Sequence, residues 1–101
     1  MYLIAEDPRG EAQFVDRGTR MVQRDRNHPC ILMWSLGNES GYGRNHAAMG
    51  SAMKQLDASR PLHYEGDRYQ PEPVTADVTS RMYPSPADII AYAEEGHQKP
   101  Y

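Results

Sequence analysis

Residues 32–41, LMWSLGNESG, decide how this chain is expected to fold. An apolar run at residues 31–34 leads into a polar segment, residues 37–41, that has glycine at both ends. The apolar run is typical of a buried parallel strand. The polar segment then places an amide, Asn38, and a carboxylate, Glu39, at the carboxyl end of that strand. Because active sites of parallel α/β barrels lie at that end, Glu39 is a candidate catalytic acid/base.

The rest of the chain alternates between helical and extended patterns. Apolar side chains recur every three or four residues in two segments, which predicts two amphipathic helices. A serine cap, a proline and an acidic residue predict the start of a third helix. We expect helices at residues 11–26 and 45–57 and from Ser85 to Gly96, and strands at residues 30–36, 62–65 and 78–83. No hairpin signal separates the strands, so an α/β fold with parallel strands is predicted.

Two motifs resemble a known family. MVQRDRNHP at residues 21–29 and MWSLGNESG at residues 33–41 are similar to the catalytic barrel of glycoside hydrolase family 2, in its large bacterial β-galactosidase type. The similarity continues through SRP at residues 59–61, YEG at residues 64–66 and MY at residues 82–83. The resemblance implies a retaining glycosidase of carbohydrate metabolism that cleaves terminal β-D-galactosides of the lactose type.

The length of the chain limits how much of that barrel it contains. A closed (β/α)8 barrel typically needs about 250 residues, and this chain has 101. The resemblance therefore implies that residues 1–101 are a segment of the TIM-barrel domain, incomplete at both ends, with about three consecutive parallel strand–helix units. The nucleophilic carboxylate is expected in a later strand, beyond Tyr101, so we expect the segment alone to be inactive.

The resemblance also assigns roles to individual residues. Glu39 is implied to be the acid/base, Asn38 to bind the sugar 2-hydroxyl, and Tyr83 to assist turnover beside the nucleophile. Mg²⁺ is implied for the complete enzyme, with Glu39 as one ligand and a Glu and a His upstream of this segment as others. One carboxylate is too few for tight binding, so no Mg²⁺ is expected on the segment by itself. A homo-oligomeric parent enzyme is implied as well.

Composition excludes several classes of partner. The chain has 11 basic and 14 acidic residues, a net charge of −3, and no basic cluster that would favour nucleic acid. No apolar run approaches the roughly 18 residues that a membrane helix needs. The first residues lack the pattern of a signal peptide, so a cytoplasmic location is expected. The single cysteine, Cys30, cannot form an internal disulfide, and we expect it to be a small buried residue.

Two other interpretations stay open from the sequence. The chain fits a stand-alone binding or interaction domain that retains the motif, and it fits a β-glucuronidase-type or β-mannosidase-type hydrolase. Cooperative unfolding of the isolated chain would favour the first interpretation. The residues that choose among sugars lie mostly outside this segment, so the sequence leaves the sugar open.

Overall fold

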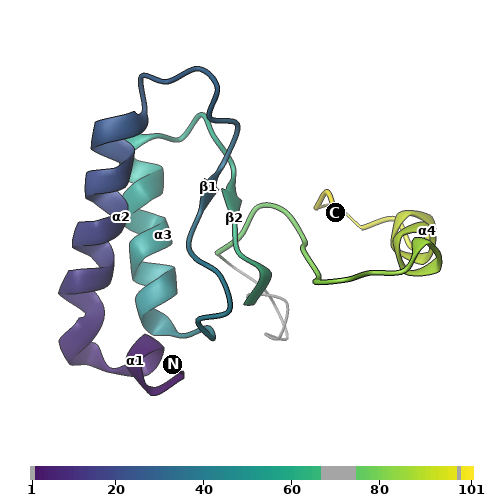
Figure 1. The fold of residues 1–101 in the computed structure, drawn as a ribbon, viewed down its shortest axis with the longest axis horizontal. Helices are drawn as coiled ribbons and strands as arrows, with labels where there is room; N and C mark the ends of the chain where they lie inside the picture. Colours follow the sequence, from purple (N-terminus) through teal and green to yellow (C-terminus); the bar gives the residue numbers. More distant parts are fainter. Residues whose placement is uncertain (1, 67–74, 98) are drawn as a thin grey trace.

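The computed structural model describes residues 2–66, 75–97 and 99–101 (Figure 1). Its elements, in chain order, are α1 (Tyr2–Glu6), the 3-10 helix η1 (Pro8–Gly10), α2 (Glu11–Asp25), β1 (Trp34–Ser35), α3 (Arg44–Leu56), β2 (Leu62–His63) and α4 (Pro86–Glu94). Helices α2 and α3 lie side by side, β1 and β2 lie next to them, and α4 lies apart beyond the strands (Figure 1). The two packed helices and the small sheet together fix the position of the segment that follows β1.

The strands are parallel, as the sequence predicts. In β1 and β2, Trp34 is opposite Leu62 and Ser35 is opposite His63. The Leu36 N–H donates to the His63 carbonyl at 3.0 Å, so the pairing continues one residue past β1. Parallel neighbours joined by a helix are the α/β arrangement expected from the alternating patterns. The carboxyl ends of both strands therefore lie at one edge of the sheet.

The prediction of a third strand at residues 78–83 is wrong in its extent. Within the described part of the chain it is reduced to one parallel bridge between His63 and Val78. The Thr79 N–H donates to the Pro100 carbonyl at 2.7 Å instead of to a neighbouring strand. Tyr83 has φ 53°, a left-handed conformation that cannot continue an extended segment. The described residues therefore contain two short strands and a bridge, not three full strand–helix units.

The apolar run before the polar segment is buried only in part. Trp34 and Leu36 are 2% and 8% exposed, whereas Leu32 is 77% exposed. Leu32 precedes β1, whereas Trp34 belongs to it and Leu36 continues the pairing with β2. The expectation that the apolar run at residues 31–34 forms a buried strand is therefore confirmed only from Trp34 onward. Cys30 is exposed, contrary to prediction, because it lies in a turn before β1 and not in the strand.

Helices α2 and α3 pack through the apolar stripes that the spacing predicts. Val22 of α2 and Met53 of α3 are fully buried. Gly18 allows the close approach: a Cβ at that position would lie 2.5 Å from Cγ of Met49. Both helices begin and end within one residue of the predicted bounds. The core of the described residues consists of Val22, Trp34, Leu36, Met49, Met53, Leu62 and Tyr64.

Helix α4 begins and ends where the sequence predicts. The Ser85 Oγ accepts from the Asp88 N–H at 3.1 Å, and the Asp88 carboxylate accepts from the Ser85 N–H at 2.9 Å, which forms a capping box. Gly96 follows the helix with φ 71°, the left-handed conformation common at helix ends. Ile89 and Ile90 on this helix are exposed, so α4 contributes little to the core.

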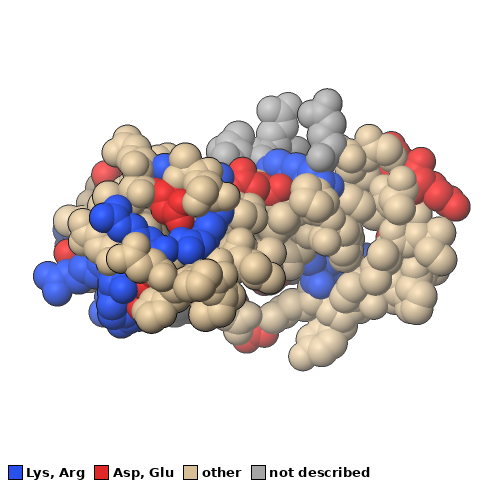
Figure 2. Space-filling view, turned by 90° about the horizontal axis from the view of Figure 1, so that it is seen from above, with Lys and Arg blue, Asp and Glu red and all other residues tan. Residues whose placement is uncertain are grey.

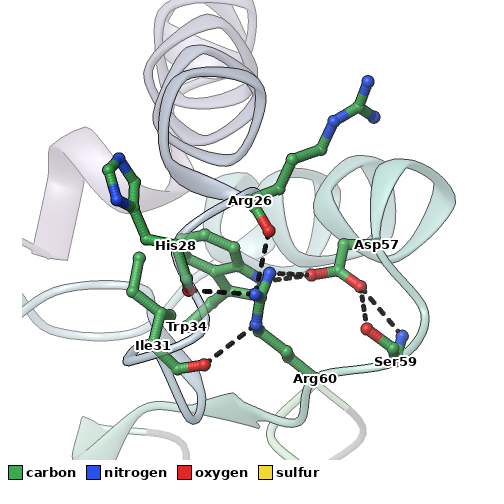
Figure 3. Close-up of polar contacts among 7 residues, drawn as sticks. All are labelled: Arg26, His28, Ile31, Trp34, Asp57, Ser59 and Arg60. Carbon is green, nitrogen blue, oxygen red and sulfur yellow. Dashed lines mark hydrogen bonds and ion pairs between the residues drawn. The ribbon is translucent and has the colours of Figure 1, made fainter.

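One arginine organises the turn that leads into β1 (Figure 3). Arg60 Nε donates to the Ile31 carbonyl at 2.9 Å. Its Nη2 donates to the carbonyls of Arg26 and His28 at 2.8 and 3.1 Å. Backbone carbonyls of a turn need such partners when they are not paired in a helix or a sheet. Arg60 therefore fixes how the chain passes from α2 to β1.

The same guanidinium faces a carboxylate and an aromatic ring. Arg60 Nη1 lies 2.8 Å from Asp57 Oδ2, and its Cζ lies 5.2 Å from the centre of the Trp34 ring. The Trp34 indole N–H donates to Asp57 Oδ2 at 3.1 Å. The Ser59 hydroxyl and N–H donate to Asp57 Oδ1. The hydrogen bond from the Ser59 hydroxyl, supported by the other donors, holds the pKa of the Asp57 carboxyl well below its usual value, although partial burial opposes this.

Replacing Asp57 by Asn is expected to lower stability at neutral pH and to weaken its dependence on acid. Because folding lowers the pKa of Asp57, its ionised form stabilises the fold above the unfolded-state pKa, and that contribution is lost as the pH falls toward the folded-state pKa. Unfolding in urea between about pH 5 and pH 2 measures this loss. Asp16→Asn, which removes an exposed ion pair to Arg20, is the control. Equal pH dependence in the Asp57 variant and the unchanged chain would contradict the assignment.

Charged side chains of both signs are mixed on the surface. On the face shown in Figure 2, Lys and Arg lie beside Asp and Glu over much of the helical part. Ion pairs such as Arg24 with Asp25, 2.8 Å apart, contribute to this mixing. Among the residues that the structure describes, no helix is long and apolar enough to cross a membrane.

Candidate active site

The segment that follows β1, which we name the Glu39 loop (residues 37–41), carries the residues that the sequence singles out. Asn38 and Glu39 are both exposed. Within the described part of the chain, the structure records no hydrogen bond or ion pair to the Glu39 side chain. The loop leaves the carboxyl end of β1, which is where the sequence predicts a catalytic group. Its acidic group is therefore open to a ligand that approaches from outside.

Two of the predicted site residues have an unusual backbone. Glu39 has φ 50° and Tyr83 has φ 53°, and among the described residues they are the non-glycine residues with positive φ. This conformation costs on the order of 1–3 kcal/mol and persists only where the surroundings enforce it. Such strain gathers at functional sites, so its presence at Glu39 supports a functional reading. The flanking Gly37 and Gly41 also have positive φ, 147° and 70°.

The Glu39 loop is attached to the rest of the fold through Ser40 and Gly41. Ser40 Oγ lies 2.6 Å from Tyr64 Oη and 3.3 Å from Nε2 of His46. The Tyr64 hydroxyl also donates to the Gly41 carbonyl. Tyr64 and His46 are each 1% exposed, and their rings stack with centres 4.6 Å apart. The exposed acid is thus next to a buried polar cluster that restrains its loop.

The sequence assigns no role in the site to His46 or Tyr64. His46 lies in α3 and is buried. Tyr64 is expected only within the strand predicted at residues 62–65. A signal for it existed: β2 is the parallel neighbour of β1, and the carboxyl ends of such neighbours meet at one edge. The contact from Tyr64 to Ser40 follows from that adjacency.

Tyr83 lies in a different setting from the one expected. It is 95% exposed and does not end a strand, because its left-handed backbone interrupts the extended segment. Within the described residues, no recorded hydrogen bond or ring contact joins Asn38, Glu39 and Tyr83. The roles of these three residues stay predictions.

Glu39 is the residue of this chain that the resemblance makes a magnesium ligand. Mg²⁺ takes six oxygen-type ligands in near-octahedral geometry and is usually bound by one or two carboxylates plus waters or substrate. Glu39 offers one exposed carboxylate, and within residues 2–66, 75–97 and 99–101 no group of three or more His, Cys, Asp or Glu side chains is placed to bind a metal ion.

Comparisons with known proteins agree with the resemblance in the motifs. Residues 1–101 match the family model described as glycosyl hydrolases family 2, TIM barrel domain. A β-galactosidase of Kluyveromyces lactis is 48% identical over 84 residues, which are 83% of this chain and 8% of that protein. A β-galactosidase of Oenococcus oeni is 61% identical over 66 residues, 65% of this chain and 6% of that protein.

A third relative aligns over nearly the whole chain. The β-galactosidase large subunit of Leuconostoc lactis is 44% identical over 98 residues, which are 95% of this chain and 16% of that protein. The chain thus spans only a small part of the length of the relatives it matches. Because the family model covers every residue, the chain belongs to glycosyl hydrolase family 2 and is a segment of its TIM-barrel domain.

Proposed function

We propose that this chain is the acid/base segment of a retaining β-galactosidase. The observation that carries the proposal is Glu39: a carboxylate in a strained left-handed conformation at the carboxyl end of a parallel strand. The family match over residues 1–101 and the relatives named β-galactosidase support it. The substrate is then a terminal β-D-galactoside, such as lactose.

Glu39 acts twice in this reaction. Retaining glycosidases use two carboxyl groups about 5–5.5 Å apart. In the first step, protonated Glu39 gives its proton to the glycosidic oxygen while the other carboxylate attacks the anomeric carbon and the C–O bond breaks. In the second step, the Glu39 carboxylate takes a proton from water, which attacks the anomeric carbon and releases the nucleophile. Its exposure leaves Glu39 accessible to both sugar and water.

Asn38 and Tyr83 assist in this proposal. The Asn38 amide both donates and accepts hydrogen bonds, so it suits the sugar 2-hydroxyl, whose hydrogen bonds strengthen in the transition state. Tyr83 is assigned to the neighbourhood of the nucleophile, and its exposed phenol is available for such a contact. The nucleophile itself is a carboxylate in another part of the complete polypeptide.

The segment alone is then catalytically incomplete. Without the nucleophile no glycosyl-enzyme forms, and covalent catalysis is lost. Any Mg²⁺ required by the complete enzyme would likewise need ligands from outside these residues. We therefore expect purified residues 1–101 to show no turnover of a β-galactoside.

The test uses the complete gene product that carries this segment. We expect it to hydrolyse lactose and aryl β-galactosides, and proton NMR during turnover should show β-galactose as the first product. Under the same conditions, β-glucuronides and β-mannosides should react at least about tenfold more slowly, the discrimination that about 1.4 kcal/mol provides. If the gene product prefers a glucuronide or a mannoside, the proposed substrate is wrong but the family assignment stands. A first product of inverted configuration, or turnover by residues 1–101 alone, would contradict the proposal.

A further inference from the structure

We propose that Tyr64 and His46 are positioning residues for Glu39, because both belong to a partly buried chain of hydrogen bonds that fixes the Glu39 loop. The inference rests on the proposed function, in which Glu39 is the acid/base. Neither residue touches the reacting atoms in this proposal. Both act through Ser40 and Gly41, the two residues that directly follow Glu39 in the chain.

The chain of contacts joins three separate parts of the fold. His46 belongs to α3, Tyr64 follows β2, and Ser40 lies in the Glu39 loop. The distances are 3.3 Å from Ser40 Oγ to His46 Nε2 and 2.6 Å from Ser40 Oγ to Tyr64 Oη. The Tyr64 hydroxyl also bonds to the Gly41 carbonyl. One loop hydroxyl is therefore attached at the same time to a helix and to the end of the neighbouring strand.

The direction of the protons follows from counting donors. A hydroxyl has one proton to donate, and a carbonyl can only accept. The Tyr64 proton goes to the Gly41 carbonyl, so Tyr64 Oη must accept from Ser40. Ser40 then has no proton left, and the His46 Nε2–H must donate to it. The order is His46 to Ser40 to Tyr64 to the Gly41 carbonyl, and each hydroxyl both accepts and donates.

Packing gives the two buried rings little freedom. His46 stacks on Tyr64 with ring centres 4.6 Å apart, and Phe14 meets the edge of His46 at 5.1 Å. Gly66 brings the backbone close: a Cβ there would lie 2.9 Å from both the Gly41 carbonyl oxygen and the Tyr64 ring. The polar end of the Tyr64 side chain is therefore held near the loop by its surroundings.

The loop needs such restraint because of its backbone. Gly37, Glu39 and Gly41 all have positive φ within five residues. A left-handed glutamate persists only where the surroundings over-determine it. The Glu39 carboxylate has no recorded partner in the described part of the chain, so its direction depends on the backbone that Ser40 and Gly41 fix. Releasing that backbone would spread the carboxylate over several orientations.

Tyr64→Phe in the complete gene product is the sharpest test. The substitution keeps the ring and its stacking but removes the hydroxyl from the chain. A displaced acid slows the hydrolysis of substrates whose leaving group needs a proton. It has little effect on the rate when the leaving group departs as a stable anion. We expect kcat/KM for lactose, which reports the first step, to fall about 10- to 100-fold, since small misplacement of a catalytic group can cost that much. For 2,4-dinitrophenyl β-galactoside, whose departure needs no acid, we expect kcat/KM to change within about threefold.

Two further variants separate positioning from folding. Ser40→Ala should give the same leaving-group dependence, and Ser40→Thr, which keeps a hydroxyl, should restore most of the activity toward lactose. Tyr42→Phe is the matched control, since Tyr42 stacks on His46 with ring centres 5.8 Å apart but its hydroxyl pairs with Thr75. Its effect should be equally small for both substrates. If Tyr64→Phe fails to fold, the comparison of Ser40→Ala with Ser40→Thr decides whether the hydrogen-bond chain positions Glu39.

The outcomes distinguish this inference from the proposed function. Equal losses toward lactose and the dinitrophenyl galactoside in the Tyr64 and Ser40 variants would overturn the positioning role, as would no loss in either. If the unchanged gene product does not hydrolyse β-galactosides, the proposed function fails and the positioning role toward Glu39 fails with it. If the gene product is active and Glu39→Gln leaves the leaving-group dependence unaltered, the assignment of Glu39 and the positioning role both fail, while the β-galactosidase activity stands.

Discussion

Glu39→Gln in the complete gene product is expected to lower kcat/KM for lactose by about 10²- to 10⁴-fold, the range that general acid–base catalysis contributes. Gln has nearly the shape of Glu but cannot give a proton to the glycosidic oxygen. The loss should be far smaller for 2,4-dinitrophenyl β-galactoside, because that leaving group departs without protonation. Steady-state kinetics with the two substrates measures the difference.

The second step offers an independent check of the same residue. With the base removed by Glu39→Ala, water attacks the glycosyl-enzyme slowly, whereas an anionic nucleophile such as azide needs no proton removed. Azide should therefore accelerate turnover of the dinitrophenyl substrate in this variant and yield a β-galactosyl azide. The absence of both acceleration and azide product would contradict the assignment of Glu39 as the base.

Glu65 provides the matched carboxylate for this experiment. It follows Tyr64 at the end of β2 and is half-buried, whereas Glu39 is exposed. The resemblance places the nucleophile in a later strand, so Glu65 is not assigned to the catalytic pair. Glu65→Gln should change kcat/KM for lactose and for the dinitrophenyl galactoside equally. A loss confined to lactose in the Glu65 variant would move the acid/base role from Glu39 to Glu65.

Local patterns in the sequence were enough to predict helices α2, α3 and α4. The stripes on α2 and α3 depend on residues three and four positions apart, and the capping box of α4 depends on Ser85 and Asp88. Such signals lie within one or two turns of chain, so they can be read without knowledge of distant contacts. The position of Glu39 after β1 was predictable for the same reason, since the apolar run and the polar loop are adjacent.

The features that the sequence did not predict depend on contacts between residues that are far apart in the chain. The exposure of Leu32 depends on which elements pack beside the residues before β1. The exposure of Cys30 depends on the turn that Arg60 fixes from 30 positions later. The contact from Tyr64 to Ser40 spans 24 positions and requires the register of β1 with β2. A single sequence shows residue types and local spacing, but it does not show register, so these features become visible only in the fold.

Met53→Ala is expected to destabilise the isolated chain by about 2–5 kcal/mol, the cost of truncating a fully buried methionine. Met53 is completely buried, and its sulfur lies 2.9 Å from where a Cβ on Gly18 would stand, so the cavity opens at the contact of α2 with α3. Urea unfolding followed by circular dichroism measures the change. Leu32→Ala is the control, because Leu32 is 77% exposed and should change stability by no more than about 0.5 kcal/mol in the isolated chain.

The same pair of variants tests whether the chain is a segment of a closed barrel. In a complete barrel, further strands and helices would cover the exposed apolar side chains that precede β1, Leu32 among them. Leu32→Ala should then become costly in the complete gene product, with a thermal inactivation temperature that falls as it does for Met53→Ala. In the isolated chain only Met53→Ala should be costly. A neutral Leu32→Ala in both proteins would mean that Leu32 stays exposed in the complete protein, which contradicts a barrel built around this segment.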